Sequence, residues 1–182
     1  MTKNHLQRFM GDIGSFGLSR VDLEVSRDIR GEFHKILPNT LIPDLFSREI
    51  EEIFYTTSIK GTVRGMHIQT TPYSMQKIIL VIQGTIRDIV VCVQAESVNY
   101  KKYYSVEISA GDRGLFIPSG YAHGFQVVSE SATVLYLTDA KFNKKYDTGF
   151  HFSALNQEWP IKEKIVSDKD SNLLSIDKFL IL

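Results

Sequence analysis

Apolar and polar residues alternate over short stretches along most of this chain, and the alternation is densest from residue 50 onward. A period of two residues predicts β-strands, and no long helical pattern interrupts them. The predicted strands cover residues 51–58, 61–69, 75–83, 85–94, 102–109, 113–117, 123–129 and 132–138. They follow a shorter strand at 21–25 and a turn at 28–33 that leads into another short strand. Many short strands separated by turns are typical of a sandwich or a jelly-roll β-barrel.

Two of these strands are predicted to be buried on both faces, because Ile78–Ile82 and Ile89–Val93 are continuous apolar runs. Gln83-Gly84 between two such runs predicts a tight hairpin. The sequence therefore predicts an all-β jelly-roll barrel, with at most short helices at its periphery.

The remaining segments are less regular. Residues 1–20 are polar with scattered apolar positions and are expected to form a loosely held N-terminal arm, and 36–48 is expected to be a loop or a short helix. Near the other end, Trp159-Pro160 is expected to pack as an anchor, and a short helix is expected after Ser167. A length of 182 residues suits a single domain over 1–182.

Charge and cysteine content restrict the setting. Lys plus Arg and Asp plus Glu are balanced at 21 each, without a long basic run, which argues against nucleic acid or an anionic membrane as a partner. The single cysteine, Cys92, is expected to be a buried thiol, and a chain without intramolecular disulfides fits the reducing cytoplasm. The N-terminus lacks the apolar core of a signal peptide, and no apolar run reaches membrane-spanning length. We therefore expect a soluble cytoplasmic protein.

Candidate chemistry concentrates in the stretch Gly61–Gln69 and in Lys77, which opens the next strand. His67 and Gln69 share one strand face with Gly65, whereas Arg64 falls on the other face unless a bulge at the glycine turns it back. A cation, an imidazole and an amide beside a glycine indicate a site for a polar, anionic small ligand. A single hydrogen-bonded strand histidine is the alternative.

A metal centre is not expected here. Zinc, iron and manganese sites need three or four His, Cys or carboxylate donors, and His67 and His123 with a nearby lysine are a poor set. The same residues suit proton abstraction beside a carbonyl. His67 is a candidate base, and Lys77 is a candidate donor to the enolate oxygen. The alternative for Lys77 is a solvated residue at a strand end.

Several segments together carry a resemblance to a known family. They are Asp28–Phe33, Gly61–Gln69, Gln76-Lys77, Ile117–Phe125, Glu158–Pro160 and Val166–Asp170, in this order along nearly the whole chain. With these segments the chain resembles the dTDP-4-dehydrorhamnose 3,5-epimerases. The resemblance implies a cupin-like barrel, a homodimer that exchanges N-terminal strand pairing, and a reaction without cofactor on a nucleotide-linked 4-keto-6-deoxy sugar.

The resemblance also implies roles for single residues. The residue matching His67 removes the proton beside the ketone, Asp170 orients that histidine, and Lys77 stabilises the enolate. Positions matching Arg64, His123 and Arg30 hold the substrate or its diphosphate, and Gln69 and Phe142 complete the set of expected substrate-binding residues.

The chain also departs from the family pattern. An alignment without gaps places Phe142 where the family has its acid tyrosine, with Tyr136 and Tyr146 as substitutes nearby in sequence. Phenylalanine cannot give a proton, so the expectation is either inversion at one centre, C3, or the use of an altered acid. An alignment slip of a few residues is the alternative explanation. In place of the family's Gln-x-Asn-x-Ser pattern the chain has Glu52–Ser58, and Lys35 stands at a usually acidic position, so a different base or sugar is plausible.

Three functions remain open from the sequence. The first is epimerisation of the nucleotide sugar, the second is a keto-sugar isomerase on the same barrel, and the third is a non-catalytic sugar-nucleotide binding protein. The contexts Arg-Gly-Met-His and Ala-His-Gly-Phe favour the first over the second. The presence of both His67 and Asp170 argues against the third.

Overall fold

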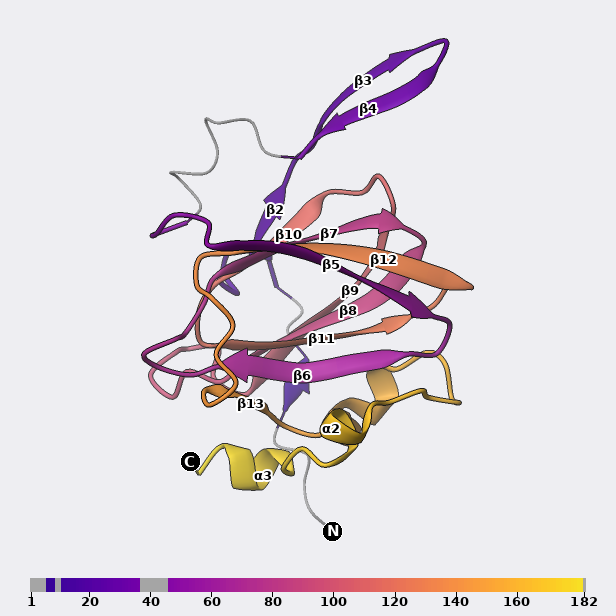
Figure 1. Cartoon of the computed structure of the whole chain (residues 1–182). Helices are drawn as coiled ribbons and strands as arrows, with labels where there is room; N and C mark the ends of the chain where they lie inside the picture. The colour runs from indigo at the N-terminus through magenta and orange to yellow at the C-terminus, as the bar shows by residue number, and fades with distance from the viewer. Residues whose placement is uncertain (1–5, 9–10, 37–45, 182) are drawn as a thin grey trace.

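Two β-sheets pack face to face in this computed structural model, which describes residues 6–8, 11–36 and 46–181 (Figure 1). The six-stranded sheet has the order β1-β9-β8-β11-β6-β13, and the five-stranded sheet has the order β2-β10-β7-β12-β5. The pairings are antiparallel except for the short parallel pair of β1 with β9. The predicted all-β, jelly-roll class is confirmed.

The strands are β1 (Gln7–Arg8), β2 (Ser19–Val21), β3 (Glu24–Asp28), β4 (Gly31–Lys35), β5 (Glu52–Ile59), β6 (Val63–Gln69), β7 (Lys77–Gln83), β8 (Thr85–Cys92), β9 (Lys102–Ser109), β10 (Gly114–Ile117), β11 (Tyr121–Val127), β12 (Ser131–Thr138) and β13 (Asp147–Gly149). The helical segments are η1 (Phe152–Glu158), α2 (Asp168–Ser171) and α3 (Ile176–Phe179). Every strand predicted beyond residue 50 is present, with ends within two residues of the prediction. The predicted strand at 21–25 is divided between β2 and β3, and β13 was not predicted.

The two continuous apolar runs lie in strands that are covered on both sides. Strand β7 places Ile79 and Val81 between the sheets, and Ile78 and Leu80 in a second cluster outside the five-stranded sheet. Strand β8 likewise directs Val90 inward and Val91 outward, beneath the C-terminal segments. Burial on both faces removes the need for polar residues at alternate positions, which explains the uninterrupted runs. Cys92 is buried in the inner cluster, as expected.

The N-terminal segment is not a loose arm, and this expectation is wrong for the described residues 11–20. Phe16 and Leu18 are 0% and 1% exposed and belong to the inner core. The carbonyl of Phe16 also accepts a hydrogen bond from the Tyr121 hydroxyl at 2.6 Å. Phe16 and Leu18 are enough to fix this part of the segment because both pack into the cluster between the sheets. Residues 1–5 and 9–10, and 37–45 of the expected loop at 36–48, lie outside the described residues.

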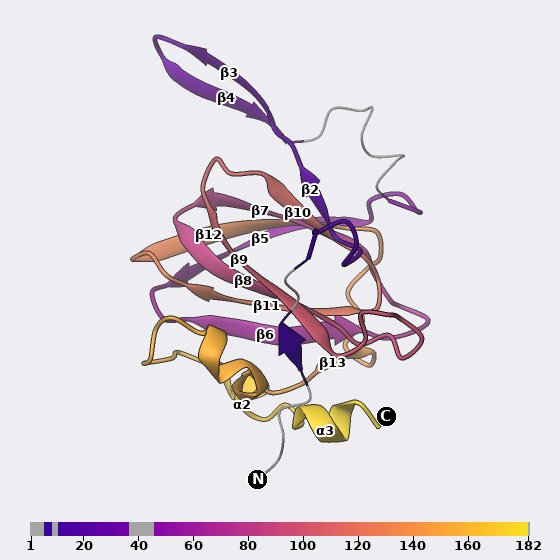
Figure 2. The same ribbon diagram turned by 180° about the vertical axis from the view of Figure 1, so that it is seen from behind.

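Two peripheral features frame the barrel. Strands β3 and β4 form a hairpin that projects away from the sheets, whereas α2 and α3 lie under the six-stranded sheet (Figures 1 and 2). Trp159 is 4% exposed and donates to the Phe152 carbonyl, so the predicted anchor is confirmed. The predicted helix after Ser167 is α2, which that residue caps. Among the described helices, none has the length and apolar character needed to span a membrane.

Candidate active site

A cavity of about 210 Å³, lined by both polar and apolar side chains, lies between the two sheets. Its polar residues occupy the same inward-facing rows that supply the core elsewhere. In β7, for example, Lys77 precedes Ile79 and Val81 on one face, and in β12 Tyr136 and Thr138 follow Val134. The lining residues are Glu52, Phe54, Thr56, Arg64, His67, Ile68, Gln69, Met75, Lys77, His123, Phe125, Tyr136, Thr138, Phe142, Asp147 and Lys169. The structure thus brings together all the predicted site residues except Arg30 and Asp170, and Asp170 contacts the cavity through His67.

A bulge in β6 places Arg64 and His67 on the same cavity. The register of β6 with β11 shifts between the pairs His67–His123 and Arg64–Phe125, and Gly65 between them has a φ of +122°. A Cβ atom at Gly65 would lie 2.6 Å from the Cα atom of Gly124, so the close approach of the strands requires glycine. The strand therefore has a bulge at Gly65, which turns Arg64 to the same side as His67.

His67 forms a dyad with Asp170, which α2 presents from below the sheet. The Nε2 atom of His67 lies 2.6 Å from Oδ1 of Asp170, and the other carboxylate oxygen accepts the Gly65 N–H at 3.1 Å. Burial alone would raise the Asp170 pKa, but the hydrogen bond and charge of His67, the Gly65 N–H and Lys169 hold it below its ordinary value. A carboxylate only accepts, so this hydrogen bond requires a proton on Nε2 of His67, which in the neutral ring leaves the lone pair on Nδ1. The side chain of His67 is 31% exposed, which leaves it accessible from the cavity.

A second dyad stands beside the first, and sequence reasoning missed half of it. His123 is the register partner of His67, and its Nε2 atom lies 2.7 Å from Oδ2 of Asp88 in β8. Both side chains are buried, and Oδ1 of Asp88 has no hydrogen-bond partner among the described residues. The available signal was an aspartate in the inward-facing row between Ile86 and Val90, where an unpaired charge would be costly.

Lys77 reaches the cavity from the opposite sheet. Burial lowers the pKa of its ammonium to about 8, while the carboxylates of Asp147 and Asp88 act in the other direction. Asp147 is also ion-paired with Lys169, the neighbour of the dyad carboxylate in α2. Lys77 is therefore a half-buried cation inside the cavity, and the alternative of a solvated strand-end lysine is wrong. Neither Asp147 nor Lys169 was singled out from the sequence.

Tyr136, rather than a residue of the following loop, places a phenol in the cavity. Its ring stacks on Phe54 at 4.8 Å between centroids and is 8% exposed. Burial raises the pKa of Tyr136, and the charge of Asp88 raises it further, while the Thr56 hydroxyl and the Arg64 charge lower it by less. The phenol therefore stays neutral at ordinary pH. Phe142 also lines the cavity and is 58% exposed.

Two predicted binding residues have different surroundings. Gln69 is 4% exposed, and its amide is occupied by the backbone: it donates to the carbonyls of Tyr73 and Lys141 and accepts the Asn143 N–H. Its polar atoms thus hold the loop that carries Phe142. Arg30 lies in the tip of the β3–β4 hairpin, bonded to Asp28 and outside the cavity of its own chain. Within the described residues, no group of three or more His, Cys, Asp or Glu side chains is arranged to hold a metal ion.

Comparison with known proteins gives a consistent result. The family model for dTDP-4-dehydrorhamnose 3,5-epimerase matches residues 16–178. A relative of that name from Shigella flexneri is 33% identical over 154 residues, covering 82% of this chain and 85% of the relative. The structure of a dTDP-4-dehydrorhamnose 3,5-epimerase from Bacillus anthracis with TDP and PPi bound is similar with a TM-score of 0.83 and 27% identity, over 91% of this chain and 97% of that one. The corresponding structure from Sulfolobus tokodaii has a TM-score of 0.80 and 31% identity, over 88% and 96%.

Proposed function

Because the chain belongs to the dTDP-4-dehydrorhamnose 3,5-epimerase family, we propose that it inverts the carbons beside the ketone of a dTDP-linked 4-keto-6-deoxy sugar. One observation carries the mechanism: His67 and Tyr136 line the same cavity from opposite sheets. Inversion requires that a proton leave one face of the sugar ring and another arrive on the opposite face. A base and an acid on facing walls meet this requirement.

The proposed steps balance without an oxidant or a cofactor. Nδ1 of His67 takes the proton from the carbon beside the C4 ketone, and the electron pair of that C–H bond moves to form an enolate with its charge on the C4 oxygen. The ammonium of Lys77 stabilises this oxygen. The Tyr136 phenol then gives its proton to the same carbon from the other face, and both side chains return to their first state by exchange with water.

The buried Asp170 supports the base in two ways. It holds the His67 ring through Nε2, which fixes the tautomer that leaves Nδ1 free. Its negative charge stabilises the imidazolium that forms when the proton is taken. Because Tyr136 supplies an acid, the reason for expecting inversion at C3 alone no longer holds, and the proposal covers both C3 and C5.

The size of the cavity indicates which part of the substrate it holds. At about 210 Å³ it is smaller than the range of about 300–1,000 Å³ usual for drug-sized ligands, so it suits the sugar ring alone. Arg64 also lines a second hollow of about 410 Å³ with Ser58 and Ser167. The exposed Arg64 guanidinium, whose Nε donates to Ser58 Oγ at 2.9 Å, is therefore proposed to hold the diphosphate between the two hollows.

The projecting hairpin supports a homodimer. An isolated two-stranded hairpin is barely stable in water, yet β3–β4 exposes Ile29 and Phe33. Among the strands that the structure describes, β5 has no partner on its outer side, and it exposes Ile53, Tyr55 and Ile59. We propose that each hairpin pairs with β5 of a second copy, which would bring Arg30 to the partner's cavity. This arrangement accounts for the distance of Arg30 from the cavity of its own chain.

The testing experiment is deuterium incorporation from D₂O into a dTDP-4-keto-6-deoxyhexose, followed by NMR at C3 and C5 with the configuration of each product determined. The proposal predicts deuterium together with inversion at both carbons. Exchange with a displaced carbonyl would instead identify a keto-sugar isomerase. Binding of the ligand without exchange at either carbon would identify a non-catalytic binding protein and overturn the proposal.

A further inference from the structure

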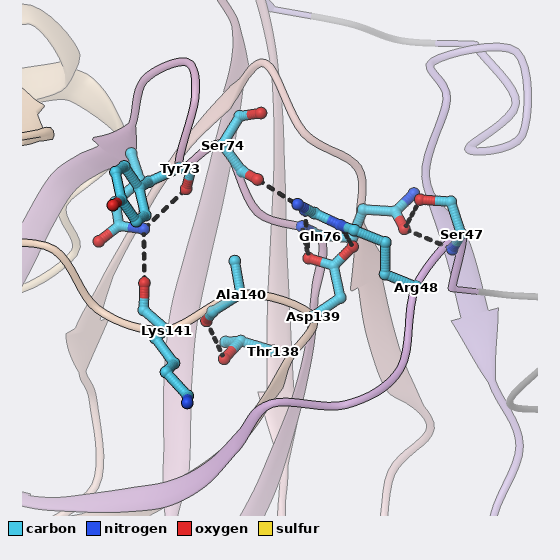
Figure 3. Close-up of polar contacts among 10 residues, drawn as sticks. Ser47, Arg48, Tyr73, Ser74, Gln76, Thr138, Asp139, Ala140 and Lys141 are labelled. Atoms are coloured by element: carbon cyan, nitrogen blue, oxygen red, sulfur yellow. Dashed lines mark hydrogen bonds and ion pairs between the residues drawn. The ribbon is translucent and has the colours of Figure 1, made fainter.

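A partly buried ion pair lies at the end of β12, where a half-exposed Arg48 meets the buried Asp139 just beyond the cavity residue Thr138. Asp139 has a side chain with no exposed surface, and it accepts bonds from both Nε and Nη2 of Arg48 at 3.0 Å each. The Gln76 N–H is a third donor, at 2.6 Å. Figure 3 shows the guanidinium and the carboxylate side by side in this cluster. Neither Arg48 nor Asp139 lines the cavity, so neither can contact the substrate there.

The pair is joined to the two strands that carry cavity residues. Gln76 immediately precedes Lys77, Asp139 immediately follows Thr138, and Lys77 and Thr138 are register partners of β7 and β12. The Asp139 N–H also donates to the Gln76 carbonyl at 3.3 Å, so the two residues are bonded in both directions. These contacts determine where β7 begins and hence where Lys77 enters the cavity.

The preceding segment is held at the same point. The side-chain oxygen of Gln76 accepts both the N–H and the hydroxyl of Ser47 at 2.8 Å each, and Nη2 of Arg48 donates to the Ser74 carbonyl at 2.7 Å (Figure 3). A planar guanidinium that bonds a carboxylate through two nitrogens fixes direction as well as distance. The start of β7 is therefore bonded from both sides in a fixed geometry.

We propose that Arg48 and Asp139 are positioning residues that place the Lys77 ammonium against the oxygen on which negative charge develops. The inference rests on the proposed epimerase function, because only there does the position of Lys77 affect a rate. A one-ångström displacement of such a donor weakens stabilisation of the enolate while the bound ground state changes little. The expected result is a loss in kcat with little change in KM.

The test compares Arg48→Met with Arg48→Lys and with the control Arg113→Met. Arg113 forms an exposed ion pair with Asp22 away from the cavity, so the control makes the same chemical change without touching the cluster. We expect Arg48→Met to lower kcat by about tenfold or more with KM within about twofold. Arg48→Lys should recover part of the loss, and Arg113→Met should change neither constant. An unchanged kcat in folded Arg48→Met, or an equal loss in the control, would overturn the proposal.

A double-mutant comparison separates positioning from general damage. If Arg48 acts through Lys77, Arg48→Met should cost little further activity in a Lys77→Met background. A full additive loss there contradicts the proposal. If Arg48→Met does not fold, the same comparison is made with Arg48→Lys. A loss of activity that is equally large in the wild-type and the Lys77→Met background then contradicts the proposal.

A readout independent of activity distinguishes this inference from the function on which it rests. Lysines labelled by reductive ¹³C-methylation report their titration by NMR, and Lys77→Arg identifies the resonance of Lys77. Its pKa of about 8 should rise toward the ordinary lysine value of about 10.4 in Arg48→Met, because water reaches a displaced ammonium. This shift would stand even if the wild-type protein exchanged no deuterium. An unchanged titration would overturn the positioning role.

Discussion

His67 in β6 and Tyr136 in β12 face one cavity from the two opposite sheets of the barrel. In the proposed mechanism, a substrate ring between them has a base on one side and a neutral phenol on the other. This arrangement would let a rigid barrel invert a carbon centre without turning the substrate over.

The first prediction concerns the base. Replacing His67 by alanine should reduce deuterium exchange by about 10²–10⁴-fold, because proton removal loses its acceptor, while dTDP binding persists. The measurement is NMR of exchange together with calorimetric titration of dTDP. His151→Ala is the matched control, since His151 lies outside the cavity and bonds Ser153. Undiminished exchange in His67→Ala would reject the assignment of the base.

The second prediction concerns the acid. Tyr136→Phe should reduce formation of inverted product by about 10²–10⁴-fold, whereas exchange with retained configuration continues because His67 can return a deuteron to the same face. The control is Tyr146→Phe, because Tyr146 does not line the cavity and its ring packs on Tyr73 with 4.9 Å between the ring centroids. This variant should behave as wild type. Recovery of inversion by Phe142→Tyr in the Tyr136→Phe background would instead assign the acid to position 142.

The third prediction concerns pH. The Lys77 pKa is about 8, so its ammonium is present below that pH and is lost as the pH rises through it. The exchange rate should therefore fall above about pH 8. Lys77→Met should be slower by about 10²–10³-fold and should lack this alkaline decline. A wild-type profile that stays level from pH 7 to about pH 10 would contradict the role of the ammonium.

The fourth prediction concerns the bulge. Gly65→Ala should lower the free energy of unfolding by about 2–6 kcal/mol, since it adds backbone strain and overpacking of about 1–3 kcal/mol each. Gly111→Ala shares a positive φ, +86°, but its Cβ would meet no atom within 4 Å. That control should cost only about 1–2 kcal/mol. Equal losses in urea denaturation would show that the approach to Gly124 is unimportant.

The fifth prediction concerns the dimer. If Arg30 serves the cavity of a second copy, mixing Arg30→Ala with His67→Ala after dissociation should restore one intact site per mixed dimer. Random pairing then gives about a quarter of wild-type activity. Without exchange of subunits the mixture should stay inactive. Sedimentation at micromolar concentration provides the independent check, and a monomer there removes the proposal.

Local sequence pattern was sufficient for the strands because burial acts on each strand separately. The runs at Ile78 and Ile89 pack on both faces, and their composition alone says so. The burial of Phe16 could not be foreseen, since it depends on an open edge between two sheets that form from residues far away in sequence. Strand β13 was missed because its three residues pair only with β6 and carry no pattern of their own.

Part of the candidate site could likewise be predicted from local sequence pattern. His67 and Lys77 stand out in strand contexts, but Asp170 in a charged segment required the resemblance to a family. Asp88 is separated from His123 by 35 residues and meets it only across adjacent strands. From the sequence Tyr136 was only one of two nearby substitutes for the acid, because an alignment identifies a position, whereas the direction of a side chain depends on the pairing of β12 with β5 and β7.

The bulge at Gly65 has a consequence for engineering this cavity. A regular strand offers every second side chain to a pocket, so positions three apart cannot both be recruited. In this chain both Arg64 and His67 line the cavity, so one strand offers two side chains to a ligand instead of one. Libraries that seek new substrates can vary the facing residues of β5, such as Phe54 and Thr56, while position 65 stays fixed as glycine. Gly65 is therefore both the residue that brings two side chains of β6 to the cavity and the position of β6 that cannot be varied.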